Sequence, residues 1–185
     1  MSPLLETLEY EESDNAMENQ HRFRVVAWWA AGQTGIAQSN SALPAIHFSS
    51  PPAFGGLNAR WTPEDLLLCS LASCYTTTFG AIAKSSKFPY TDLQVEVEGA
   101  ISKTDPGYNF GAIVIRAKLI IPTEQKADPA LALKLLQKAK ELCLISRALS
   151  VEQRFELRVQ LGESRASLAQ SSPLSNPVSN KENRP

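Results

Sequence analysis

The chain has 185 residues, of which 18 are basic and 19 acidic, so its near-neutral balance creates no long-range field to attract nucleic acid or an anionic membrane. Its three cysteines are too few for the disulfide framework of a secreted protein. Its first residues lack the pattern of a signal peptide, and no uninterrupted apolar run is long enough to span a membrane. We therefore expect one cytoplasmic domain with tails.

The N-terminal third of the chain predicts an arm followed by strands. Residues 1–20 are acidic and polar, which predicts a flexible N-terminal arm. A run rich in β-branched and aromatic residues predicts a strand over 22–30, and a Gly-Gln-Thr-Gly turn returns it as a hairpin through 36–39. Residues 40–61 contain three prolines and a Gly-Gly pair, which indicates a long irregular connection with at most one short strand, near 45–48.

A long helix is predicted from Pro63 to about Lys87. Thr62 supplies an N-cap, and Pro63 needs no N–H donor at the first helical position. Glu64 and Asp65 place negative charge at the positive end of the helix dipole. The middle of the segment is almost free of charge but contains serines and threonines, so we expect the buried central helix of a soluble domain rather than a membrane span.

The remaining elements of the domain are predicted from alternating apolar and polar residues and from residues typical of turns and helix caps. In chain order the predicted elements are a strand over 93–102, a turn at 105–107, a strand over 111–121, a helix capped by Asp128, a short helix over 146–150 and a strand over 152–161. Periodicity is then lost, which predicts a disordered tail over 163–185. Hairpin-joined strands, with helices that do not alternate with them one for one, predict an α+β fold with antiparallel sheets over residues 21–162.

The sequence offers little for metal or phosphate chemistry. His21 and His47 are isolated, with no cysteine or carboxylate at ligand spacing, so no metal site is expected. No Gly-rich phosphate loop and no G-x-S-x-G elbow is present. We expect no cofactor, and the cysteines remain as candidates for chemistry.

Cys69 and Cys74 are five residues apart in the predicted long helix, which separates them by roughly 140° around its axis. They cannot form a disulfide with each other while the helix is intact, so any pairing involves Cys143. A buried helical cysteine is most often a small apolar filler. Spacing alone does not choose between Cys69 and Cys74 as a reactive thiol.

Two segments carry a family resemblance. Residues 63–67 (PEDLL), followed at 72–74 by ASC, resemble the N-P-E-x-L…A-x-C helix of the OsmC/Ohr family of osmotically induced and organic hydroperoxide resistance proteins. Residues 140–149 (KELCLISRAL) resemble that family's second motif, K-x-x-C-P-V-S-x-x-L. The similarity covers about residues 21–161, and Cys69 has no counterpart in either motif.

The resemblance implies an intertwined homodimer with antiparallel sheets packed around the long central helix. It also implies a thiol-dependent peroxidase that reduces organic hydroperoxides without a cofactor. By position, Cys74 is the expected peroxidatic thiol, whose thiolate attacks the peroxide and becomes a sulfenic acid. Cys143 then resolves this acid to a disulfide, which is reduced by a small thiol or by a dithiol such as dihydrolipoamide, free or on a lipoylated protein.

The resemblance further assigns Glu64 as the acid that positions an arginine beside the thiol, where it lowers the thiol pKa. Glu64 lies about 15 Å along the helix from Cys74, so a bridging cation or a residue of the partner subunit is required. The family's arginine belongs to the first hairpin turn, which here holds Gln33 instead. Arg60 and Arg24 are the candidate substitutes, each with a solvated surface charge as the alternative.

Two other features bear on the function. Leu144 stands where the family often has proline, which is expected to change little beyond the helix join.

An aromatic cluster is expected to form core and dimer interface, with a ligand cage as the alternative; it comprises Trp28, Trp29, Phe48, Phe54 and Trp61. The missing arginine and this cluster favour a second hypothesis, an OsmC-like dimer that binds small apolar ligands or senses oxidation with little turnover. In a third, all three thiols are core packing.

Overall fold

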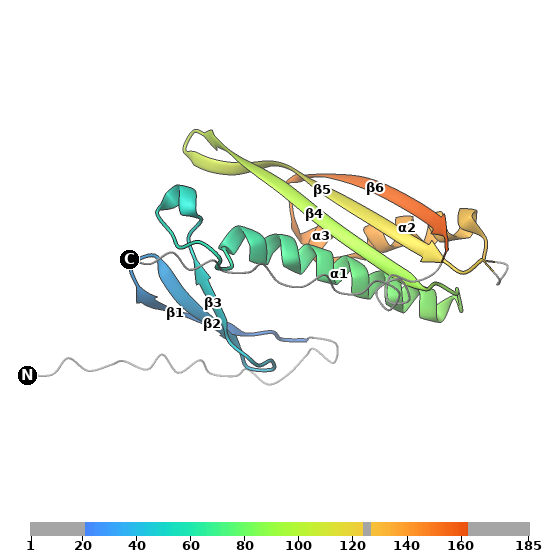
Figure 1. The fold of residues 1–185 in the computed structure, drawn as a ribbon, viewed down its shortest axis with the longest axis horizontal. Helices are drawn as coiled ribbons and strands as arrows, with labels where there is room; N and C mark the ends of the chain where they lie inside the picture. Colours follow the sequence, from blue (N-terminus) through green and yellow to red (C-terminus); the bar gives the residue numbers. More distant parts are fainter. Residues whose placement is uncertain (1–20, 124–126, 163–185) are drawn as a thin grey trace, which may run out of the picture. The chain divides into compact units, whose positions relative to one another are not determined.

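A computed structural model describes residues 21–123 and 127–162. These residues fall into two compact units, one that ends at Trp61 and one that begins at Thr62. Figure 1 labels the elements of both. The arm predicted for residues 1–20 and the tail predicted for 163–185 lie outside the described residues.

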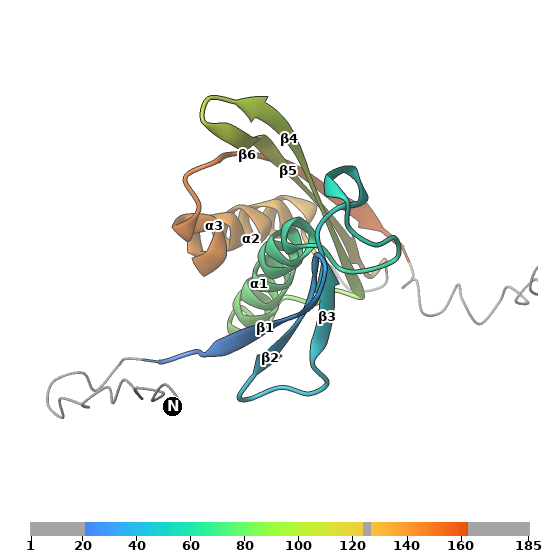
Figure 2. The ribbon, with the colours of Figure 1, turned by 90° about the vertical axis from the view of Figure 1, so that its left-hand side faces the viewer.

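The N-terminal unit is a three-stranded antiparallel sheet in the order β1-β2-β3, seen in Figure 2. Its strands are β1 (Val25–Ala31), β2 (Thr34–Ser39) and β3 (Ile46–Ser49). The predicted hairpin and the short strand in the connection are therefore confirmed. A Cβ at Gly35 would lie 2.4 Å from the ring of Phe48, so only glycine fits where these strands meet. A short 3₁₀ helix, η1 (Pro52–Phe54), interrupts the connection that follows.

The tryptophans of this unit are not core residues in a single copy. Trp28, Trp29 and Trp61 are 52%, 76% and 51% exposed, whereas Phe48 and Phe54 are half-buried. The expectation of an aromatic core is therefore wrong for the tryptophans. The reason is that a small sheet has too few neighbours to bury its aromatic side chains, since the described part of its own unit adds only the single turn η1. Their predicted role in a dimer interface stays a prediction.

The second unit combines a sheet with helices, as the α+β prediction requires. Its elements are α1 (Pro63–Ser85), β4 (Asp92–Thr104), β5 (Gly107–Ile121), α2 (Pro129–Leu142), α3 (Leu144–Ala148) and β6 (Glu152–Leu161). β4 and β5 form the antiparallel hairpin that the Asp-Pro-Gly turn predicts. The helices α1 and α2 pack against each other on the same face of this sheet, as Figures 1 and 2 show.

β6 departs from the predicted antiparallel pairing. It runs parallel to β5, with Ile115 opposite Phe155. Here the prediction is wrong, because α2 and α3 carry the chain back along the sheet before β6 begins, and such a crossover returns the next strand in the same direction. The sheet is mixed, in the order β4-β5-β6.

The helix α1 begins as predicted. The Asp65 backbone N–H donates to the Thr62 hydroxyl over 3.1 Å, and the Thr62 backbone N–H donates to the Asp65 carboxylate over 3.0 Å. This capping box satisfies two N–H groups that a helix end leaves without partners. The helix ends at Ser85, two residues before the predicted Lys87, whose positive φ of 50° is incompatible with helix.

Length and apolarity alone would allow α1 to cross a membrane. Several of its serine and threonine hydroxyls already have a hydrogen-bond partner within the helix, because they donate to carbonyls of the preceding turn. Examples are Ser70 to Leu67 and Thr76 to Ala72. One face of the helix instead packs in the core, as in the central helix of a soluble domain. Its central position in the whole molecule and the cytoplasmic location both stay predictions.

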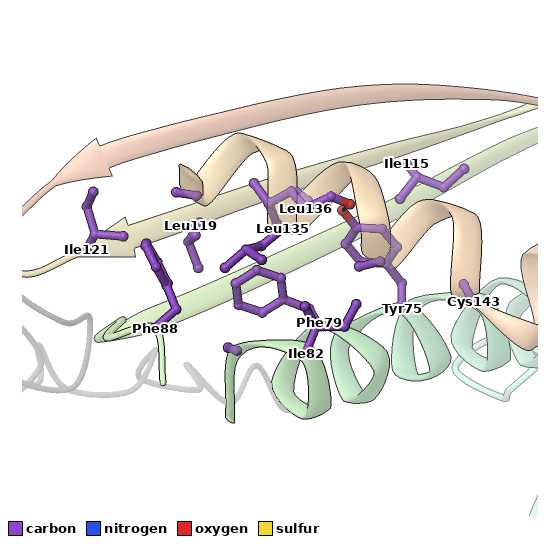
Figure 3. Close-up of a cluster of buried hydrophobic side chains, with 14 of the residues drawn as sticks. Tyr75, Phe79, Ile82, Phe88, Ile115, Leu119, Ile121, Leu135, Leu136 and Cys143 are labelled. Atoms are coloured by element: carbon purple, nitrogen blue, oxygen red, sulfur yellow. Dashed lines mark hydrogen bonds between the residues drawn. The ribbon is translucent and has the colours of Figure 1, made fainter. Parts of the chain in front are cut away.

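The core of the second unit lies between α1, α2 and β5 (Figure 3). Its largest fully buried side chains include Tyr75, Phe79, Ile115, Leu119, Ile121 and Leu136. The Tyr75 hydroxyl donates to the Leu136 carbonyl oxygen over 2.9 Å, which satisfies the one polar group of that ring. Cys143 belongs to the same buried cluster, so one of the three cysteines is fully part of the core.

Candidate functional site

The site begins with Cys74, in the middle of α1. Its position follows from the helix start at Pro63 and from the buried stripe that Leu71, Tyr75 and Phe79 form on α1. Cys74 borders this stripe and packs against the core while remaining only partly buried. A thiol in such a position touches the protein interior on one side and is open to a reagent on the other.

Cys143 lies where α2 ends and α3 begins. Its backbone N–H donates to the Ala139 carbonyl over 2.9 Å, and its own carbonyl accepts from the Arg147 N–H over 3.0 Å, so the residue closes one helix and opens the next. Its side chain has no exposed surface. α3 begins two residues earlier than the sequence predicts, at Leu144.

The structure brings the thiols of Cys74 and Cys143 together, and both are free. Burial raises the pKa of the Cys74 thiol, but hydrogen bonds act in the other direction. In order of effect, these come from the Ile145 backbone, the Cys143 thiol, the Thr78 side chain and the Leu144 backbone. Together they outweigh burial, so the pKa of Cys74 lies below the ordinary thiol value.

Cys143 has the opposite electrostatics. Burial raises the pKa of the Cys143 thiol, and its proximity to Cys74 raises it further. Hydrogen bonds from the Ser146 and Ile145 backbones lower it by less. When one of the pair ionises, the negative charge therefore resides on Cys74 and the proton on Cys143.

Cys69 lies apart from this pair. It faces a different direction from Cys74 on α1, as the separation of roughly 140° around the helix predicts. Its side chain is exposed, so the expectation that Cys69 is a packing residue, and with it the hypothesis that all three thiols are core, is wrong. Cys74 and Cys143 are thus the two thiols, among the described residues, that could form a disulfide without unwinding a helix.

The other predicted site residues lie at the start of α1 or in the N-terminal unit. Glu64 lies in the first turn of α1, and its Oε2 atom is buried without a hydrogen-bond partner among the described residues. Arg24 is exposed just before β1, and Arg60 is exposed near the end of the connection. Gln33 is exposed in the β1–β2 turn, with its amide close to Gly55. These last three residues belong to the N-terminal unit, and none is among the groups that lower the pKa of Cys74.

Sequence reasoning missed the backbone of residues 144–146 and the side chain of Gln153. The Ser146 hydroxyl and the Gln153 side-chain oxygen lie 2.5 Å apart, and the Gln153 amide donates to the Ser146 carbonyl over 2.9 Å. Backbone donors leave no residue-type signal in a sequence. The sequence held one hint: directly after Cys143 it has Leu144, which keeps its backbone N–H, where the family motif often has proline, which has none.

Comparison with known proteins gives consistent matches. Residues 56–158 match the family model described as OsmC-like protein. The uncharacterized protein YmaD of Bacillus subtilis (strain 168) is 31% identical over 145 residues, which cover 77% of this chain and 97% of YmaD.

Solved structures share the fold at lower identity. An OsmC-like protein of unknown function from Vibrio cholerae has a TM-score of 0.67 at 17% identity, covering 75% of this chain and 99% of its own. The organic hydroperoxide resistance protein OsmC of Legionella pneumophila has a TM-score of 0.62 at 20% identity, covering 77% and 99%. OhrB of Bacillus subtilis, an organic hydroperoxide resistance protein, has a TM-score of 0.55 at 21% identity, covering 76% and 98%.

Proposed function

The chain belongs to the OsmC family, and from this membership we propose that it is a thiol-dependent peroxidase that reduces organic hydroperoxides. The observation that supports the proposal most is the pair of adjoining thiols whose pKa values are displaced in opposite directions, down for Cys74 and up for Cys143. An attacking thiol needs a thiolate at neutral pH, whereas a resolving thiol needs to remain protonated and close by until it is used.

The proposed cycle uses the chain's own two sulfurs. The Cys74 thiolate attacks one peroxide oxygen, the O–O bond breaks, and the alkoxide leaves with a proton as an alcohol. Cys74 is then a sulfenic acid, oxidised by two electrons. The Cys143 sulfur attacks the Cys74 sulfur, hydroxide leaves as water, and a disulfide forms. A small thiol or a dithiol such as dihydrolipoamide supplies the two electrons that reopen it.

Glu64 is proposed to hold a cation in this site. A buried carboxylate oxygen without a hydrogen-bond partner is costly, which favours pairing with a positive side chain. Arg60 and Arg24 are the proposed partners, with Gln33 as an uncharged donor, in the same chain or in the second copy of the proposed homodimer.

The test is thiol counting on the purified, reduced protein after addition of cumene hydroperoxide. We expect two thiols to disappear per chain, with a disulfide between Cys74 and Cys143 in a peptide digest. Cys74→Ser should abolish peroxide consumption. Cys143→Ser should still react once and accumulate a sulfenic acid that dimedone traps.

Cys69→Ser is the matched control, because it removes the exposed thiol of the same helix and should leave turnover unchanged. The proposal fails if Cys74 and Cys143 stay reduced while a known thiol peroxidase turns over under the same conditions.

One observation favours the second hypothesis, an OsmC-like dimer that binds small apolar ligands or senses oxidation. Among the described residues, the groups that lower the pKa of Cys74 are hydrogen-bond donors and include no cation. In a sensor, peroxide would form the disulfide, but excess reductant would reduce that disulfide back to the two thiols only slowly. Steady-state consumption of hydroperoxide with dihydrolipoamide separates the two, because only a peroxidase consumes many equivalents per chain.

A further inference from the structure

One face of β6 contacts the chain on both sides of Cys143. Successive residues of a strand point to opposite faces, and the half-buried face of β6 includes Gln153 and Phe155. Phe155 contacts Lys140, three residues before Cys143. Gln153 contacts Ser146, three residues after Cys143. Two successive positions on one strand face therefore bracket the buried cysteine.

The contact before Cys143 is a cation over an aromatic ring. Lys140 opens the second sequence motif and lies in the last turn of α2, and its Nζ atom is 4.9 Å from the centroid of the Phe155 ring. The negative face of the ring attracts an ammonium at this distance, and a positive charge also suits a helix C-terminus. The same ring packs against Tyr75, the neighbour of Cys74 in α1, with 5.8 Å between the ring centroids. Phe155 thus joins the end of α2 to the turn of α1 that carries Cys74.

The contact after Cys143 consists of hydrogen bonds. The Ser146 hydroxyl and the Gln153 side-chain oxygen lie 2.5 Å apart, and the Gln153 amide donates to the Ser146 carbonyl over 2.9 Å. Ser146 belongs to α3, which has five residues, and an isolated helix of that length is not stable in water. β6 therefore gives α3 support that so short a helix lacks on its own.

We propose that Lys140 and Gln153 are positioning residues that hold the Cys143 sulfur in place for disulfide formation. In the proposed cycle this sulfur attacks the sulfenic acid of Cys74. The S–S bond forms, the S–O bond breaks, and the Cys143 proton leaves with the hydroxide as water. A sulfur that is already held in place loses little freedom in this step, so its effective concentration at Cys74 is high. The inference rests on the proposed function for its purpose, but the position of the sulfur is testable without peroxide.

The test is the equilibrium between the two thiols and the Cys74–Cys143 disulfide in buffers of reduced and oxidised glutathione, in a Cys69→Ser background that removes the third thiol. Oxidised glutathione takes two electrons from the protein thiols and becomes two molecules of reduced glutathione. Peptide-level mass spectrometry gives the disulfide fraction, and the midpoint gives the effective concentration of the thiols. A residue that only stabilises the fold affects both redox states equally and leaves this concentration unchanged.

Lys140→Gln removes the charge, whereas Lys140→Arg keeps a cation that can lie over the ring. We expect Lys140→Gln to lower the effective concentration about three- to tenfold and Lys140→Arg to retain most of it. The control Lys138→Gln, which alters an exposed lysine of the same helix, should match the parent protein. An unchanged value in Lys140→Gln would overturn the role of this lysine, and so would equal losses in the glutamine and arginine variants.

Gln153→Leu removes both hydrogen bonds to Ser146 and should lower the effective concentration by a similar factor. Its control is Gln160→Leu, which alters an exposed glutamine of the same strand and should change nothing. Lower stability to urea with an unchanged effective concentration would refute the positioning role of Gln153. Should Gln153→Leu not fold, the Lys140 series decides the proposal. A chain that fails to turn over peroxide but shows these shifts in the glutathione equilibrium would count against the peroxidase proposal alone.

Discussion

At the scale of single residues, Tyr75 connects the two helices that carry the candidate thiols. It follows Cys74 in α1, and its hydroxyl donates to the Leu136 carbonyl of α2, the helix that Cys143 closes. Its ring also packs against Phe155 of β6 at a centroid distance of 5.8 Å. The residue beside the candidate nucleophile therefore fixes α2 and β6 relative to α1.

Tyr75→Phe should cost about 1 kcal/mol at neutral pH, because it deletes one buried hydrogen bond and leaves the ring in place. Burial raises the pKa of Tyr75, and Cys143 adds to the shift. The folded chain thus keeps a proton that the unfolded chain loses above about pH 10, so stability present below that pH is lost as pH rises further. Urea unfolding at about pH 7.5 and 10.5 should show a smaller alkaline loss in the variant than in the wild type.

A matched control for this prediction is Tyr90→Phe, which alters a ring that is 40% exposed and packs edge-on against Phe79. It should change the free energy of unfolding at neutral pH by less than about 0.5 kcal/mol. An alkaline loss in Tyr75→Phe as large as in the wild type would contradict the assignment.

At the scale of elements, the start of α1 determines where the candidate nucleophile lies. The position of Cys74 along and around α1 depends on how many residues separate it from the start of the helix. A shift of the helix start at Thr62 would therefore displace Cys74 as well. Thr62 is buried, and both halves of its capping box with Asp65 are formed.

Thr62→Ala should destabilise the protein by about 1 kcal/mol, the usual cost of losing an N-cap. Thr62→Ser keeps the hydroxyl and should recover most of that loss. Thermal or urea unfolding measures both, and Thr123→Ala, in the exposed turn after β5, should be neutral. Equal destabilisation by the alanine and serine variants would mean that packing of the methyl group, not capping, is what Thr62 contributes.

At the scale of the whole molecule, a single copy leaves large apolar side chains of the N-terminal unit exposed. They include Phe23, Val25, Trp28, Trp29, Leu43, Leu57 and Trp61. When exposed apolar side chains form a contiguous patch, that patch is more often an interaction site than a surface that stays in contact with water. The proposed homodimer would give them a partner.

Sedimentation equilibrium should therefore give twice the 20.2 kDa of one chain at micromolar concentration. Trp28→Ser should shift the equilibrium toward the monomer, since it removes a large apolar side chain from the proposed interface. Leu133→Ser, on the exposed side of α2, is the control and should not change the mass. A monomer for the wild-type chain would exclude the homodimer.

Local signals made much of this architecture predictable. Asp128 and Pro129 marked the start of α2, and the alternation over 152–161 matched β6 at both ends. The direction of β6 was not predictable, because alternation reports which face a residue occupies and carries no information about strand direction. The sequence motifs pointed to Cys74 and Cys143. They did not point to Leu144 or Gln153, because backbone donors and a single long-range amide leave no pattern of spacing.

The crossover between β5 and β6 also determines when the thiol pair can assemble. β4 and β5 are separated by two residues and can pair from local contacts, whereas β6 must wait for the whole of residues 122–151. Cys143 and Leu144 belong to that late segment. A partly folded chain with α1 and the hairpin alone lacks three of the four groups that lower the pKa of Cys74, because Cys143, Leu144 and Ile145 all belong to the late segment. We therefore expect Cys74 to gain most of its reactivity only when that segment folds. Pulse alkylation during refolding should show the pH midpoint of Cys74 falling as β6 becomes protected from hydrogen exchange.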